Sequence, residues 1–355
     1  MGERVKRARL AAGVSQSDLA DAVGLDRTMI AKVEAGRRRL DAFELARVAS
    51  KLSVPMRLLV EPRPYVLSHR VVQLTDDNET DATRTTEQLD VVLASWIADI
   101  HQLVDFGVLK LPNRMSYPGA VTTRDDAHSA AMWVRSEVGI GLDPIETLMS
   151  LCETVGQLVL VTSVPGDGAS AIDGDIAASV VSLTGDPGRR RATAAHELGH
   201  LLLGDEYSSD LGIHASRSER ESIVDAFAAQ LLLPTTVLVK TAGASPSRET
   251  LVRCAALYKT SWSLVLKQAE LAGLIDGHQR RRLNLSKPTR VELSDAVGWA
   301  PQPDLDGVRV PPSYAHAVVT AWRQDLVTTA RAVELMHGQI SAEDLETRDG
   351  LDIEP

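Results

Sequence analysis

The sequence predicts a mainly helical protein with a small β-sheet, that is, an α+β fold. Apolar residues recur at helical spacing through most of the 355 residues. Only two short segments, 157–163 and 176–184, have the apolar, β-branched character of strands. Capping residues, glycines and prolines fall between the helical segments, where they begin and end them. We therefore expect many short helices around one small sheet.

At this length the chain is expected to contain two or three domains. Charge divides it, because residues 1–60 carry 12 Lys/Arg and 7 Asp/Glu while the remainder carries 26 and 41. A basic head on an acidic body indicates that the head meets a polyanion. The expected divisions are a head at 1–60, a linker and connecting helix at 61–125, a main domain at 126–275, and a helical C-terminal region with an acidic tail at 276–355.

Composition excludes several classes of protein. No apolar run approaches the roughly 20 residues that a membrane-spanning helix needs, and the N-terminus lacks the apolar block of a signal peptide. The two cysteines, Cys152 and Cys254, lie far apart in the sequence. A disulfide scaffold or a cysteine zinc cluster is therefore not expected. These features predict a cytoplasmic protein with no membrane partner.

The segment 13–36 has the layout of two short helices around a tight turn. Ser15 and Asp18 fit a capping box at the first helix, and Gly24 supplies the turn. Asp26 can cap the second helix and Gly36 can end it. Flanking helices at about 3–12 and 41–52 would close a small core that includes Val5, Leu10, Leu19, Ala20, Val23, Ile30, Val33, Leu45, Val48 and Leu52.

Over about 60 residues this layout resembles the Cro/repressor-like XRE family of helix-turn-helix domains. The resemblance implies that the second helix lies in the major groove of double-stranded operator DNA and that the head works as a homodimer. An ordinary four-helix bundle with solvated arginines is the alternative. The implied contacts are Arg27, Thr28 and Lys32 on the outer face, Gln16 before them, and Arg37, Arg38 and Arg39 on phosphates.

Residues 61–85 are polar and rich in turn formers, which predicts a linker. A helix follows at 87–106, where apolar residues recur at helical spacing. This helix is expected to pack on the next domain, with dimerisation as the alternative. Further on, the expected order is helices at 127–138 and 144–154, the two strands, a helix at 190–203, a helix at 219–233 ended by Pro234, and additional helices at 247–273 and 311–338.

The stretch 196–200 spells HExxH inside a segment that is predicted to be helical. His196 and His200 are four residues apart, so they project from one helical face, close enough to hold a single metal ion. Glu197 stands where a general base for a metal-activated water is needed. The motif therefore predicts a metal site with hydrolytic chemistry.

A zinc site with two histidines needs a third protein ligand, and a carboxylate on a neighbouring helix can supply it. Glu221 is the leading candidate, and Asp210, Glu219 and Asp225 are the alternatives. Asp225 lies one turn after Glu221 and can accept the free ring N–H of a ligand histidine. The arrangement HExxH…ExxxD resembles that of the gluzincin metallopeptidases.

Three longer motifs resemble the ImmA/IrrE family of zinc metallopeptidases over about 127–275: WVRSEVGIGLDPIETLMSLCETVG, GRRRATAAHELGHLLLGD and ERESIVDAFAAQLLLP. The resemblance implies a zincin-like domain with Zn²⁺ on His196, His200 and Glu221, and Glu197 as the catalytic base. It also implies that the strand at 176–184 is an edge strand that pairs with an extended peptide substrate. One mild departure from the family is Val224, where relatives often carry alanine, and it leaves the ligand spacing intact. Candidate oxyanion donors are Tyr207, His214 and His128.

Together these features predict a cytoplasmic DNA-binding regulator that carries a zinc endopeptidase. By family analogy its protein substrate is a repressor or antitoxin-like protein, including another copy of this chain. Two alternatives stay open: a closed zinc site without turnover, and a non-proteolytic transcription factor or antitoxin whose metal domain senses a ligand or binds a partner. Glu197 favours the enzyme, because a glutamate at that position is not needed merely to hold a metal.

Overall fold

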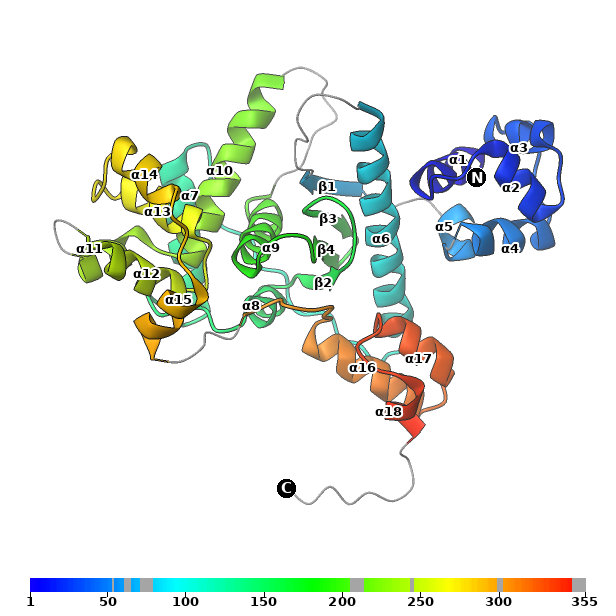
Figure 1. The fold of residues 1–355 in the computed structure, drawn as a ribbon. Helices are drawn as coiled ribbons and strands as arrows, with labels where there is room; N and C mark the ends of the chain where they lie inside the picture. Colours follow the sequence, from blue (N-terminus) through cyan, green and yellow to red (C-terminus); the bar gives the residue numbers. More distant parts are fainter. Residues whose placement is uncertain are drawn as a thin grey trace. The chain divides into compact units, whose positions relative to one another are not determined.

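The computed structural model describes residues 1–52, 54–60, 65–70, 79–204, 214–242, 246–298 and 303–346. The chain divides into two compact units: unit 1 comprises residues 1–110, 162–182 and 313–355, and unit 2 comprises 111–161 and 183–312. Helices dominate and the strands are few (Figure 1), so the predicted α+β class is confirmed. Among the described residues no single helix is long and apolar enough to cross a membrane, although the bent pair Ser218–Leu232 and Thr235–Thr241 passes on length and composition.

The head of unit 1 contains the four predicted helices and one short addition. The capping box of Ser15 and Asp18 is present at the second helix, and Gly24 ends that helix with a φ of 73°. Asp26 is the N-cap residue of the third helix, as predicted, although its side chain makes no capping hydrogen bond. The helices are α1 (Gly2–Ala11), α2 (Gln16–Val23), α3 (Arg27–Glu34), α4 (Ala42–Lys51) and α5 (Met56–Val60).

The core of the head is almost the one that the sequence predicted. Leu10 is the exception, because it is 42% exposed. Val5, Ala8 and Ala11 repeat every three residues and so form the buried face of α1, which leaves Leu10 on another face. The buried cluster contains Val5, Leu19, Ala20, Val23, Ile30, Val33, Leu45, Val48 and Leu52, with additional residues from α5 and Ala94.

The remainder of unit 1 is built on the long helix α6 (Glu79–Asp105), which begins eight residues before the predicted start at Glu87. It packs against α1, where Gln88 Nε2 donates to the carbonyl oxygen of Ala11 at 2.8 Å. Helices α16 (Pro312–Arg323), α17 (Thr329–Leu335) and α18 (Ala342–Glu346) follow at the C-terminal end. The rings of Trp96 of α6 and Tyr314 of α16 pack in a tilted arrangement, with centroids 4.4 Å apart.

The sheet contains two strands that the sequence did not predict. These are β1 (Tyr65–Arg70), inside the expected linker, and β3 (Gly168–Asp173). β3 pairs antiparallel with β1 on one side and with β4 (Ile176–Ser182) on the other. With β2 (Leu158–Thr162) the strand order is β1-β3-β4-β2, so β4 is an inner strand. The expectation of an edge strand at 176–184 is therefore wrong, because strands adjoin β4 on both sides.

Unit 2 is mainly helical and centres on α9 and α10. α9 begins at Pro187 rather than at 190, because the Asp186 side chain accepts a hydrogen bond from the Arg189 amide and proline fits the first helical position. α10 packs against both α7 and α9. The helices are α7 (Arg124–Glu137), α8 (Leu148–Thr154), α9 (Pro187–Leu202), α10 (His214–Leu232), α11 (Thr235–Ala242), α12 (Arg248–Leu257), α13 (Trp262–Leu271), α14 (Gly277–Asn284) and α15 (Arg290–Val297).

Candidate metal centre and DNA-facing helix

The two histidines of the HExxH motif lie one turn apart on the same face of α9. Both are buried, at 1% exposure for His196 and 0% for His200. Their Nε2 atoms are 3.0 Å apart, and the ring centroids are 4.7 Å apart. Both imidazoles therefore direct a nitrogen to the same point, as shared coordination of one ion requires.

Glu221 of α10 brings a carboxylate to these nitrogens. Its Oε2 lies 3.1 Å from His196 Nε2 and 3.7 Å from His200 Nε2. Ligand atoms around a tetrahedral zinc ion, at ~2.1 Å from the metal, are separated by ~3.4 Å. The observed separations of 3.0 to 3.7 Å bracket that value. The three ligand atoms thus lie close to the spacing that a tetrahedral ion requires.

Asp225, one turn further along α10, contacts the other ring nitrogen of His196. Its Oδ1 lies 2.9 Å from His196 Nδ1. A carboxylate in this position accepts the Nδ1–H proton, fixes the tautomer, and leaves the Nε2 lone pair for a metal. The side chain predicted to orient a ligand histidine is therefore placed to do so.

The charge of the cluster favours a cation. Burial raises the pKa of Glu221, but hydrogen bonds with His196 and His200 and their charges outweigh it, so that pKa lies well below its ordinary value. Glu221 is therefore an anion at neutral pH. Its negative charge lies beside the two imidazole nitrogens. Two imidazoles and one carboxylate make a donor set that zinc prefers.

The structure also bears on the rival third ligands. Glu219 lies on an exposed part of α10, and Asp225 contacts the opposite nitrogen of His196. Asp210 lies outside the described residues. Within the described ranges, His196, His200 and Glu221 are the one group of three such side chains whose ligand atoms all lie within 4.8 Å of one another.

The remaining predicted residues of the peptidase site are partly placed. Glu197 follows His196 on α9 and is completely buried. His128 lies on α7, and burial lowers its pKa. Of the other candidate oxyanion donors, Tyr207 and the side chain of His214 lie outside the described residues.

Two features that position the cluster were not recognised in the sequence. A Cβ at Gly199 would lie 2.8 Å from Val224 Cγ1 and 3.0 Å from Phe227 Cδ1, so the glycine permits the close approach of α9 and α10. Arg220, next to Glu221, donates to the carbonyl oxygens of Val121 and Leu203 at 2.5 and 3.3 Å. The glycine inside HExxH was a readable signal for helix packing, whereas the partners of Arg220 depend on the fold.

In the head, α3 presents the predicted DNA-facing residues on its outer side. Arg27, Thr28 and Lys32 are exposed, whereas Ile30 and Val33 of the same helix are buried. Arg37, just beyond the helix, is also exposed. These four side chains are accessible to a DNA duplex.

Two other predicted DNA contacts have partners inside the head. Gln16 Nε2 donates to Glu34 Oε2 at 2.8 Å. Arg38 makes two hydrogen bonds to Glu44, at 2.6 and 3.0 Å. The hydrogen bond with Glu44 raises the pKa of Arg38, and the same bond lowers the pKa of Glu44. Both side chains therefore connect segments within the head, in addition to any contact with DNA.

Comparison with known families agrees with this division. A helix-turn-helix family model matches residues 5–59, and a peptidase family model described as the IrrE N-terminal-like domain matches residues 173–270. The second match includes the whole histidine–glutamate cluster. No match was found among curated proteins. The chain therefore joins an XRE-type helix-turn-helix segment to an IrrE-like segment, as the motifs predicted.

Proposed function

We propose that this chain is a cytoplasmic DNA-binding regulator that carries a zinc-dependent endopeptidase, and that the peptidase cleaves a repressor or antitoxin-like protein. The observation that carries the enzymatic part is the convergence of His196, His200 and Glu221, with Asp225 oriented behind the first histidine. We assign Zn²⁺ as the ion because two imidazoles and one carboxylate make a three-ligand set that leaves one coordination position for solvent or substrate.

When bound, zinc would supply Lewis acidity, which polarises a peptide carbonyl and lowers the pKa of water to ~7. Glu197, buried on α9 beside the ligands, would take a proton from the attacking water at its carboxylate and deliver it to the leaving amine nitrogen. Asp225 would hold the His196 ring in place throughout.

In the head, we propose that α3 enters the major groove, with Arg27, Thr28 and Lys32 facing base edges and backbone. Arg37 would contact phosphate, and Arg38 and Gln16 would add contacts while keeping their partners within the head. The domain divisions at 1–60 and 126–275 are kept in this proposal, as is a homodimer on half-sites ~34 Å apart.

The test combines metal analysis with a search for cleavage products. The parent chain and Glu197→Gln should each bind one zinc ion, whereas His200→Ala and Glu221→Ala should bind none. In cells, labelling of protein N-termini should reveal new termini with the parent that are missing with Glu197→Gln. A terminus inside a helix-turn-helix protein would identify the substrate class.

Other outcomes decide among the alternatives. Stoichiometric zinc with the same set of N-termini for the parent and Glu197→Gln would contradict the peptidase and favour a non-proteolytic regulator or a structural zinc site. Retention of zinc in both His200→Ala and Glu221→Ala would contradict the metal centre itself. DNA binding of the head is tested separately, by selection of bound duplexes from a random pool.

A further inference from the structure

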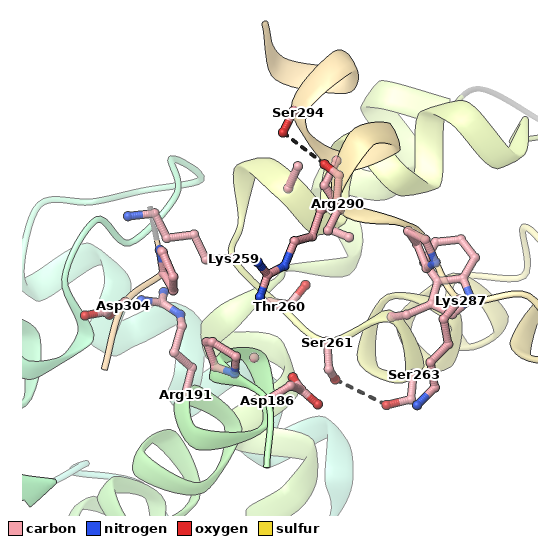
Figure 2. A pocket seen from close by; sticks show the side chains of 18 of the residues that line it. Asp186, Arg191, Lys259, Thr260, Ser261, Ser263, Lys287, Arg290, Ser294 and Asp304 are labelled. Atoms are coloured by element: carbon pink, nitrogen blue, oxygen red, sulfur yellow. Dashed lines mark hydrogen bonds and ion pairs between the residues drawn. The ribbon is translucent and has the colours of Figure 1, made fainter. Parts of the chain in front are cut away.

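A second candidate site lies in unit 2, in a cavity of about 740 Å³. Figure 2 shows it between the start of α9, the turn that joins α12 to α13, and the segment from Asn284 to Ser294. Its volume is within the range of ~300–1,000 Å³ typical of small-molecule pockets. Among the described residues that line it, none belongs to the histidine–glutamate cluster. The cavity is therefore distinct from the metal centre.

Positive charge prevails on the wall of the cavity. The buried Arg191 forms an ion pair with Asp304, so these two charges neutralise each other. The carboxylate of Asp186 caps α9 by accepting from the Arg189 amide at 3.0 Å. The remaining charged side chains of the wall are the cations Lys259, Lys287 and Arg290.

Three buried polar atoms of lining residues have no hydrogen-bond partner within the described part of the chain. They are Thr260 Oγ1, Arg191 Nε and Asp304 Oδ1. Thr260 is only 8% exposed, and in Figure 2 the side chain of Arg290 extends into the cavity toward it. Buried polar groups in native proteins are nearly always paired with protein, water or a ligand. The Thr260 hydroxyl and the Arg290 guanidinium, which extends toward it, are suited to bind an anion.

The N-termini of two helices meet at this wall. Ser261 is the N-cap of α13, and Pro187 begins α9. A Cβ at Gly188 would lie 2.5 Å from the Ser261 nitrogen, so only glycine lets the start of α9 lie against the α12–α13 turn. The start of α13 adds partial positive charge there, whereas the carboxylate of Asp186 offsets that of α9.

The wall also has an apolar part. Ala255, Ala256, Trp262 and Leu293 line it. The indole of Trp262 is fixed, because Nε1 donates to the Leu283 carbonyl oxygen at 3.1 Å and the Arg248 guanidinium stacks 5.7 Å from its ring centroid. A ligand that fits both parts of the wall has an anionic group and an organic group.

We propose that this cavity binds a small organic phosphate. Thr260, Arg290 and Lys287 hold the phosphate group at the start of α13, and the organic part lies against Trp262 and Leu293. Lys259 lies at the wall, but its Nζ donates to the Glu146 carbonyl oxygen at 3.0 Å. The site does not depend on the proposed peptidase. Its position at the first turn of α9, the helix that carries both histidines, connects it physically to the metal centre.

Calorimetric titration of the full chain tests the site, with adenosine monophosphate, adenosine and inorganic phosphate as probes. We expect saturable binding of adenosine monophosphate, weaker binding of inorganic phosphate and none of adenosine. The double variant Lys287→Gln/Arg290→Gln should lower the affinity at least about tenfold, that is, by ~1.4 kcal/mol. Arg281→Gln/Arg282→Gln, which removes the same charge from exposed positions of α14, should bind as the parent does.

Thr260→Val separates binding from folding. Because the hydroxyl has no partner within the described residues, the isosteric valine should leave the free protein at least as stable as the parent while weakening phosphate binding several-fold. The proposal is overturned if neither phosphate nor adenosine monophosphate binds at ~10 mM. Equal binding of adenosine, or parent-like affinity of the Lys287/Arg290 variant, would overturn it equally.

Discussion

Two helix pairs carry the proposed functions, and they use their residues in opposite ways. In α3, the side chains proposed to meet DNA are exposed, whereas Gln16 of α2 is part-buried beside Glu34. The buried positions of both helices are apolar. In α9, His196, Glu197 and His200 are themselves buried, at 0–1% exposure. On α10, the side chains of Glu221 and Asp225 are 33% and 37% exposed. The proposed function thus lies on the surface of the first pair and largely in the core of the second.

This difference determines how function and stability are coupled. A residue that acts outward from a complete apolar core can be changed without disturbing the fold. A buried imidazole or carboxylate needs its partners, because an unpaired polar group in the interior is destabilising. We therefore expect substitutions in α3 to affect binding alone and substitutions in α9 to affect both metal binding and stability.

The largest expected effect is that of metal removal. A ligand that binds the folded state at 1,000 times its Kd adds ~4 kcal/mol to the unfolding free energy. Addition of a chelator should therefore lower the unfolding temperature of unit 2 markedly and leave the affinity of the head for DNA unchanged. Differential scanning calorimetry and a DNA-binding titration on the same sample measure the two effects.

His200→Ala provides the control for this measurement, because it should unfold at the same temperature with and without chelator. An equal loss of DNA affinity on chelation would contradict the separation of the two helix pairs. It would show that the core of the head, built from Val5, Leu19 and Ile30 among others, is not autonomous.

The next largest effect concerns Asp225, which contacts His196 from outside the ligand set. Replacement by asparagine keeps the shape of the side chain but removes the negative charge that faces the His196 Nδ1–H group. Such changes lower metal affinity ~10–100-fold. The side chain is 37% exposed, so stability without metal should change little. Competition with a metal indicator measures the affinity, and Glu219→Gln on the same helix is the matched control. Unchanged zinc affinity would show that Asp225 does not orient the histidine.

The metal cluster could be predicted from the sequence because its geometry is local. Positions i and i+4 of a helix share a face whatever the fold around them, which brings together His196 and His200 on α9, and Glu221 and Asp225 on α10. That the two faces meet was inferred from the motif alone. Gly199, whose missing side chain allows the approach, was a local signal that the sequence analysis did not use.

Features that depend on distant partners were missed. β1 pairs with β3 about a hundred residues later, and the sequence of β3, GASAID, is too small and polar to identify as a strand. The partners of Gln16 and Arg38, and the exposure of Leu10, likewise depend on how neighbouring helices cross. The cavity of unit 2 combines four separate chain segments, so no single motif marked it.

A smaller effect is expected for the exposed residues of α3. Arg27→Gln and Lys32→Gln should each lower DNA affinity about tenfold, since a lost base contact is worth ~1–3 kcal/mol. A residue that contacts phosphate should also lower the salt dependence by ~0.9 in slope. Because both side chains are exposed, the unfolding free energy should stay within ~0.5 kcal/mol of the parent. Arg281→Gln in unit 2 is the control, and a loss of stability equal to the loss of binding would contradict the comparison.

The smallest effect is expected at Arg38, which, unlike the exposed Arg37, has a partner inside the head. Arg37→Gln should weaken DNA binding without a change in stability, whereas Arg38→Gln should also lower the urea midpoint slightly, because Arg38 binds Glu44.

The pKa of Glu44 is lowered in the folded head, chiefly by the hydrogen bond from Arg38. A lowered carboxylate pKa stabilises the fold above its ordinary range, and that contribution is lost as the pH falls through the lowered value. The difference between the parent and Arg38→Gln should therefore be full at pH 7 and shrink toward ~pH 3, below the ordinary pKa of a glutamate. A difference that persists unchanged in acid would mean that Arg38 stabilises α4 by packing of its aliphatic chain. The coupling of binding and stability at this position would then have a cause other than charge.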